Sequence, residues 1–207
     1  MPQRMRCMEI VNAYPTPIGI FEFEDSEYLN QGLVEFLYGI RDNEKSEMRS
    51  MTGNKGFHTP DDLLKRDNPY MKEFHGRISE VLLEYFPRIT TERIGEHTRM
   101  TSWGMIYGTD SYSRYHMHPG ADLSSVYYCK VPKDMKIGEG LFEYHDPRPA
   151  SLFDRNFMPS AELIKPIEGS GAIFPGWLPH STAPHTSKED RICIATNIFI
   201  DHGTFFK

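Results

Sequence analysis

The second half of the chain is a series of short β-favouring runs separated by glycine, proline and aspartate, and this pattern limits the possible folds most. The runs lie near residues 97–107, 123–131, 140–144, 162–167, 171–174 and 191–200. Short strands with turn signals between them are typical of a sandwich, barrel or jelly roll. Nothing repeats at a fixed period. We therefore expect a mainly β protein of jelly-roll type.

The first part of the chain predicts helices that accompany this β core. Residues 9–25 contain two prolines and β-favouring side chains, so we expect an extended segment there. Residues 28–40 and 70–86 each carry apolar side chains at helical spacing, with Pro87 expected to end the second helix. A further helix is expected to start near Thr59, which precedes a proline and two aspartates.

The last β run indicates how the helices and strands pack. Alternation places Arg191, Cys193, Ala195 and Asn197 on one face and Ile192, Ile194, Thr196 and Ile198 on the other. The second face is apolar and needs cover, which the helical stripes can supply, so we expect N-terminal helices packed on the major sheet. The first face is small or polar, and an arginine there predicts a space that holds a ligand.

Length, charge and cysteine content exclude several classes of protein. With 207 residues we expect one domain, in which 1–92 hold a strand and supporting helices and 93–200 form the β core. A net charge of −6 offers no basic surface for nucleic acid. No apolar run is long enough to span a membrane, and residues 1–12 lack the apolar segment of a signal peptide. Three widely spaced cysteines (Cys7, Cys129, Cys193) suit reduced thiols in the cytoplasm.

Three histidines form the candidate metal site. His116 and His118 are two residues apart, so on a β-strand both would project from one face. His180 can supply a third imidazole, and imidazole suits Fe, Zn, Cu or Ni. Three protein ligands leave coordination positions open, as in catalytic sites. Arg191 follows His180 closely enough for a short turn and a return along the neighbouring strand, and its guanidinium can bind a small dicarboxylate.

For the other histidines, tryptophans and the cysteine near these motifs we expect structural roles. His58, His145 and His185 are expected in loops or turns, Trp103 and Trp177 in the core, and Cys193 as a small apolar filler.

Several ordered motifs between about residues 103 and 198 resemble the Fe(II)- and 2-oxoglutarate-dependent oxygenases, and more narrowly their small bacterial and phage members. The motifs are His116-Met-His118-Pro-Gly, Leu123-Ser-Ser-Val-Tyr-Tyr128, Asp146-Pro-Arg148, Phe174-Pro-Gly-Trp-Leu-Pro-His180, and Arg191 to Asn197. The resemblance implies a double-stranded β-helix with Fe(II) at its mouth, held by His116, His118 and His180. It also implies that Arg191 binds the distal carboxylate of 2-oxoglutarate with help from Tyr128, and we group Asn197 with them.

The reaction implied by the resemblance is oxidative decarboxylation of 2-oxoglutarate by molecular oxygen, coupled to hydroxylation of an unidentified small-molecule or peptidyl substrate. Most of the family has a carboxylate where this chain has His118. The third iron ligand is therefore His118, a water or Asp122, with the three-histidine set favoured. Two other functions stay open: a three-histidine cupin dioxygenase that uses no keto acid, and a non-catalytic jelly-roll binding or structural protein.

Overall fold

The computed structural model describes residues 14–43, 52–53, 56–148 and 161–201. In chain order its elements are β1 (Gly19–Glu22), α1 (Glu27–Asn43), β2 (Thr52–Gly53), β3 (Phe57–His58), the 3₁₀ helix η1 (Leu63–Lys65), α2 (Pro69–Ile89), β4 (Arg99–Tyr107), β5 (Tyr112–His116), β6 (Leu123–Lys130), β7 (Phe142–His145), β8 (Ala161–Ile164), β9 (Ser170–Pro175), β10 (His180–Thr182) and β11 (Arg191–Phe199).

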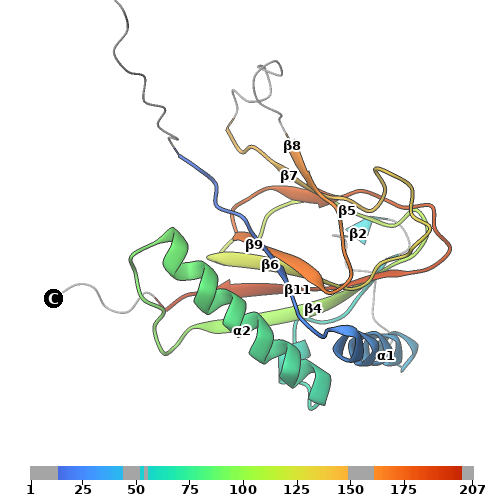
Figure 1. The fold of residues 1–207 in the computed structure, drawn as a ribbon, viewed down its shortest axis with the longest axis horizontal. Helices are drawn as coiled ribbons and strands as arrows, with labels where there is room; N and C mark the ends of the chain where they lie inside the picture. The colour runs from blue at the N-terminus through green and yellow to red at the C-terminus, as the bar shows by residue number, and fades with distance from the viewer. Residues whose placement is uncertain (1–13, 44–51, 54–55, 149–160, 202–207) are drawn as a thin grey trace, which may run out of the picture.

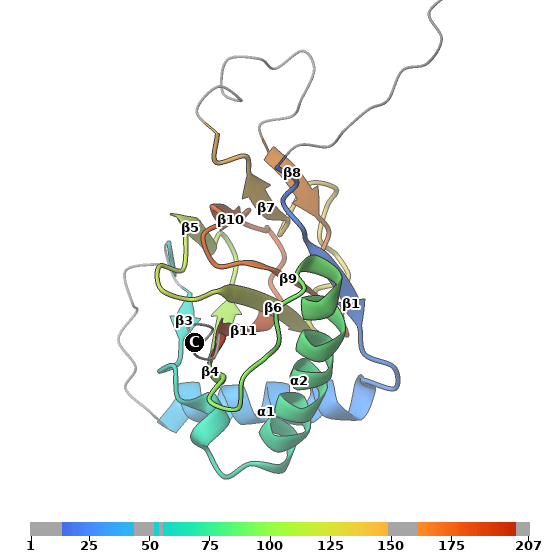
Figure 2. The ribbon, with the colours of Figure 1, turned by 90° about the vertical axis from the view of Figure 1, so that its left-hand side faces the viewer.

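The strands form two antiparallel sheets that face each other. The major sheet has six strands in the order β1-β9-β6-β11-β4-β3, and the minor sheet has five in the order β2-β5-β10-β7-β8. In Figure 1 the minor sheet lies above the major sheet, and both helices lie below the major sheet. The same layering is visible after a quarter turn (Figure 2). The mainly β, double-stranded β-helix expected from the sequence, with helices on the major sheet, is confirmed.

Strand β11 lies at the centre of the major sheet and shows why the helices pack there. It pairs with β4 over its whole length and with β6 on its other side. Ile192 and Ile194 are fully buried in a cluster with Leu37 of α1 and Phe74 of α2. The expected alternation along this strand is therefore correct, and the helices bury its apolar face.

Helix α2 begins as its sequence dictates but ends later than expected. The side chain of Asn68 caps it by accepting a hydrogen bond from the backbone of Met71, and proline occupies the first turn. Pro87 does not end the helix, which continues to Ile89. Pro87 has no N–H to donate to the carbonyl of Leu83, but it lies two residues before the end of the helix, so the missing hydrogen bond falls in the last turn.

The prediction that a helix starts near Thr59 is also wrong, because this segment is a turn followed by η1. The Thr59 hydroxyl accepts a hydrogen bond from the backbone of Gly104 in β4, so it binds the sheet and does not cap a helix.

Of the expected extended segment 9–25, residues 9–13 lie outside the described residues, as does Cys7. Cys129 and Cys193 are buried free thiols. Neither helix in the described part of the chain combines the length and apolar character needed to cross a membrane.

Candidate metal centre

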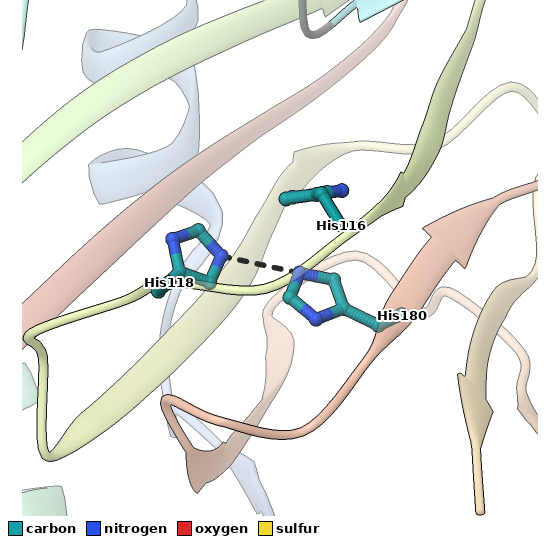
Figure 3. Close-up of side chains that lie close together, drawn as sticks. All are labelled: His116, His118 and His180. Atoms are coloured by element: carbon teal, nitrogen blue, oxygen red, sulfur yellow. Dashed lines mark hydrogen bonds between the residues drawn. The ribbon is translucent and has the colours of Figure 1, made fainter. Parts of the chain in front are cut away.

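Three imidazoles converge between the two sheets at the end of β5 and the start of β10. His116 and His180 are direct cross-strand partners, with ring centroids 4.2 Å apart. The Nε2 atoms of His118 and His180 lie 3.1 Å apart, and one ligand atom from each of the three residues lies within 4.8 Å of the others. Figure 3 shows His116 and His118 on consecutive parts of one segment, with His180 facing them from the neighbouring strand. Two nitrogens bound to one divalent ion at about 2.1 Å are about 3 Å apart, so this spacing fits shared coordination.

A β-bulge places His116 in this group. His180 pairs with His116 and Thr182 pairs with Ser113, so one residue of β10 opposes two residues of β5. Because of the extra residue, the side chains of Ser113 and His116 both face the interior, although a regular strand would put them on opposite faces.

Strand β5 ends at His116, so the expectation that both early histidines lie on one strand is wrong. His118 lies in the following loop, where its backbone N–H donates to the carbonyl of Gly176. A side chain at position 176 would approach the backbone oxygen of Ala121 to 2.2 Å, so only glycine allows this contact. The Pro-Gly-Trp motif before His180 therefore brings two loops together and positions two of the three imidazoles.

Backbone carbonyls fix the ring orientation of two of the histidines. Nδ1 of His116 lies 2.6 Å from the carbonyl oxygen of Arg114, and Nδ1 of His180 lies 2.8 Å from that of Leu178. A carbonyl oxygen only accepts, so each Nδ1 carries the hydrogen and each neutral ring presents the lone pair of Nε2. This orientation is the one that metal-binding histidines need.

Burial keeps the three imidazoles neutral. It lowers the pKa of His118 to about 4 and that of His180 to about 3, with a further decrease from the neighbouring histidines. The pKa of His116 is also lowered by burial. Neutral imidazole is the form that binds metal, so protons do not compete with a metal ion at neutral pH.

The histidines line a cavity of about 230 Å³ between the two sheets. Its floor carries the polar face of β11, and Arg191, Cys193 and Ala195 all contact it. The Arg191 side chain is 1% exposed, and its guanidinium lies 4.5 Å from the centre of the Tyr107 ring. One terminal nitrogen donates to the carbonyl of Gly140 at 2.7 Å.

Two buried polar atoms point to an anionic ligand at this end of the cavity. Among the described residues, neither Nε of Arg191 nor the hydroxyl of Tyr128 has a hydrogen-bond partner. Buried donors are nearly always satisfied, and leaving one unsatisfied costs about 1–3 kcal/mol. Burial also raises the pKa of Tyr128, so its hydroxyl stays protonated and can donate. A carboxylate accepting from both groups would satisfy them.

The structure brings most of the expected site residues together. His116, His118, His180, Arg191 and Tyr128 all line the cavity. The expectation that Arg191 lies on the strand next to that of His180 is wrong, because β10 belongs to the minor sheet and β11 to the major sheet. The loop between them crosses from one sheet to the other, so His180 and Arg191 face each other across the cavity.

Three other expectations concern residues around the site. Asn197 is on the same face of β11 as Arg191 but does not line the cavity, and its side-chain oxygen accepts a hydrogen bond from Ser124. Asp122 accepts a hydrogen bond from the backbone of Ile200 through Oδ2. His185 lies in a loop as expected, buried and 3.0 Å from the carbonyl of Tyr107.

Two ring side chains that line the cavity were expected elsewhere from the sequence. His58, expected in a loop, lies on β3, and Trp103, expected in the core, lies on β4, where both line the cavity. The alternation of β4 would have found Trp103, because it shares a face with Tyr107. No signal in the sequence marked the two-residue strand that carries His58.

The fold and this site define a double-stranded β-helix in which three histidines that could hold a metal ion face a buried arginine. Residues 101–197, just under half of the chain, match a family model described as "Putative 2OG-Fe(II) oxygenase". This part of the chain is therefore similar to the 2OG-Fe(II) oxygenases, in agreement with the resemblance seen in the sequence. The family is named for Fe(II) and 2-oxoglutarate, so the cofactor prediction is confirmed at the level of the family.

Solved structures share the fold at low sequence identity. A prolyl-4-hydroxylase from Pseudomonas putida matches with a TM-score of 0.65 at 9% identity, covering 90% of this chain and 94% of that one. The epimerase SnoN of nogalamycin biosynthesis matches with a TM-score of 0.65 at 15% identity, covering 92% and 83%. HygX from Streptomyces hygroscopicus, solved with nickel and 2-oxoglutarate, matches with a TM-score of 0.61 at 13% identity, covering 93% and 85%. No curated protein matches the chain.

Proposed function

We propose that this protein is an Fe(II)- and 2-oxoglutarate-dependent oxygenase of the hydroxylase type. His116, His118 and His180 hold the iron, and Arg191 with Tyr128 binds the distal carboxylate of 2-oxoglutarate. The observation that carries the proposal is that a buried guanidinium with an unsatisfied N–H and three neutral imidazoles line one cavity. When bound, the iron and the keto acid supply the oxidising chemistry, in which molecular oxygen decarboxylates 2-oxoglutarate and a substrate C–H bond is oxidised.

The residues of the chain bind and orient the cosubstrate and keep water away from it. Arg191 is always charged and fork-shaped, so it fixes both the position and the direction of a carboxylate. Tyr128 donates one further hydrogen bond, and the Tyr107 ring packs against the guanidinium. Apolar contacts from Val126, Phe142 and Phe174 surround the space between the arginine and the histidines. In such a low-dielectric site, the attraction between arginine and carboxylate is stronger than in water.

We propose His118 as the third iron ligand. Its Nε2 atom is close to that of His180, whereas the Asp122 carboxylate holds the backbone of Ile200. A neutral third ligand leaves the iron one charge unit more positive than an aspartate would.

A three-histidine dioxygenase that uses no keto acid is the second candidate, and the ligand set of three neutral imidazoles favours it. Arg191 argues against it, because that chemistry has no need for a buried guanidinium beside the metal.

Anaerobic reconstitution tests the proposal. Protein loaded with Fe(II) should bind 2-oxoglutarate with a new charge-transfer absorption band, and addition of oxygen should release succinate only when 2-oxoglutarate is present. Oxygen consumption without succinate would favour the second candidate. Absence of iron binding would favour the non-catalytic alternative.

A further inference from the structure

His58 lies outside residues 101–197, which carry the family match, and yet its ring lines the cavity. It is 8% exposed and stacks on Trp103, with ring centroids 5.7 Å apart and an interplanar angle of 14°. Trp103 in turn packs against His118, at 5.6 Å and 36°. Three rings from β3, β4 and the loop after β5 therefore form a continuous row that ends at a metal-site imidazole.

The outer end of this row is held firmly. Strand β3 pairs with β4, with His58 opposite Met105. Nδ1 of His58 lies 2.5 Å from the carbonyl oxygen of Thr59. Thr59 is bonded twice to Gly104, once through its backbone N–H at 3.0 Å and once through its hydroxyl at 2.9 Å. His58 and Thr59 are thus fixed to the two residues that follow Trp103, Gly104 and Met105.

The inner end of the row is the histidine that lacks the usual support. His116 and His180 are each oriented by a hydrogen bond from Nδ1 to a backbone carbonyl. Within the described residues, Nδ1 of His118 makes no such bond, and its ring contacts the other two imidazoles and Trp103. Metal-binding histidines normally depend on a partner at the second nitrogen for their orientation.

We propose that Trp103, held in place by His58, is the positioning residue that orients His118 as the third metal ligand. Aromatic packing here replaces the hydrogen bond that the other two histidines have. Without it the His118 side chain is free to adopt other rotamers, and the site becomes a two-histidine site. The proposal rests on the proposed function only in assuming that the three histidines bind a metal; it does not require 2-oxoglutarate.

Titration with Co(II) as a stand-in for Fe(II) tests the proposal, because the visible absorption of Co(II) reports its coordination. An aromatic pair contributes enough to change an affinity about three- to tenfold. We expect His58→Leu and Trp103→Leu to weaken Co(II) binding by this factor and to shift its spectrum toward that of His118→Ala. His58→Phe keeps a ring on Trp103 and should stay within about twofold of the wild type. His75→Leu, on the exposed face of α2, is the matched control and should change nothing.

A double-mutant cycle separates positioning from general destabilisation. In the His118→Ala background, His58→Leu should have no further effect on Co(II) affinity, because the ligand it positions is gone. Equal effects of His58→Leu in both backgrounds, or a Phe variant as weak as the Leu variant, would overturn the proposal. Unchanged Co(II) affinity in His58→Leu and Trp103→Leu would overturn it and leave the oxygenase function standing. If His58→Leu and Trp103→Leu weaken Co(II) binding as expected but the wild type does not bind 2-oxoglutarate, the role of Trp103 stands and the oxygenase function falls. If the wild type bound no Co(II), both would fall.

Discussion

Replacement of Arg191 by methionine tests the proposed 2-oxoglutarate site most directly. Methionine keeps an unbranched apolar stem but removes the guanidinium, which is 1% exposed and bonded to Gly140. Removing one partner of a buried charged pair costs about 2–5 kcal/mol. We therefore expect 2-oxoglutarate to bind about 30-fold to several thousand-fold more weakly, with metal affinity unchanged.

The same substitution should not destabilise the protein in the absence of 2-oxoglutarate. The buried guanidinium has no carboxylate partner among the described residues, so removing it also removes a desolvation cost. The lost contacts with Tyr107 and Gly140 oppose this gain, and we expect stability to stay within about 1 kcal/mol of the wild type. The two effects together distinguish loss of a ligand contact from unfolding.

Thermal unfolding of the metal-loaded protein, with and without 2-oxoglutarate, measures both quantities. A saturating ligand at 100 times its Kd stabilises the folded state by about 2.7 kcal/mol, and Arg191→Met should lose about two thirds of this shift or more. Arg191→Lys keeps the charge without the fork and should lose part of it. Arg41→Met, at the surface beside Asp190, is the control. Retention of the wild-type shift by Arg191→Met would refute the assignment of the carboxylate site.

Three further predictions concern the metal centre. His180→Ala should abolish metal binding. His145, whose ring nitrogen bonds to Ser181 in the minor sheet, lies outside the three-histidine group, so His145→Ala should leave metal affinity unchanged in the same titration. Three imidazoles of ordinary pKa would release about two protons on binding metal at pH 6. Burial lowers the pKa of His118 to about 4 and that of His180 to about 3, so we expect release of fewer than one proton. Calorimetry in buffers of different ionisation heat measures this number. Gly176→Ala should weaken metal binding by displacing the loop of His118, whereas Gly76→Ala, with open space around it in α2, should raise stability by up to about 1 kcal/mol in chemical denaturation.

The sequence was sufficient for the parts of the site that follow strand periodicity. Alternation along β11 put Arg191 on the cavity face and Ile192 and Ile194 under the helices, and both assignments are correct. The two faces of β11 could be assigned from the sequence of this strand alone, because a fully apolar face must be buried and a buried guanidinium needs a partner. The helical stripes were equally clear, since their period of 3.6 extends over several turns.

Irregular backbone explains what the sequence did not reveal. The bulge in β5 puts Ser113 and His116 on one face, against the period of two. His118 owes its place to a loop contact with Gly176, which no periodicity records. His58 is on a strand of two residues, too short to produce a pattern, and it reaches the site only because β3 pairs with β4. In each case a long-range backbone contact overrides the local signal.

The division of the site between two sheets constrains what it can bind. The minor sheet and its loop supply the three imidazoles, while the major sheet supplies Arg191 and Tyr128. Facing sheets lie about 10 Å apart, so a ligand that contacts both a metal at the histidines and the arginine needs a metal-binding donor and an anionic group separated by a short chain. A keto acid with a distal carboxylate meets this requirement, whereas a monocarboxylate contacts only one side.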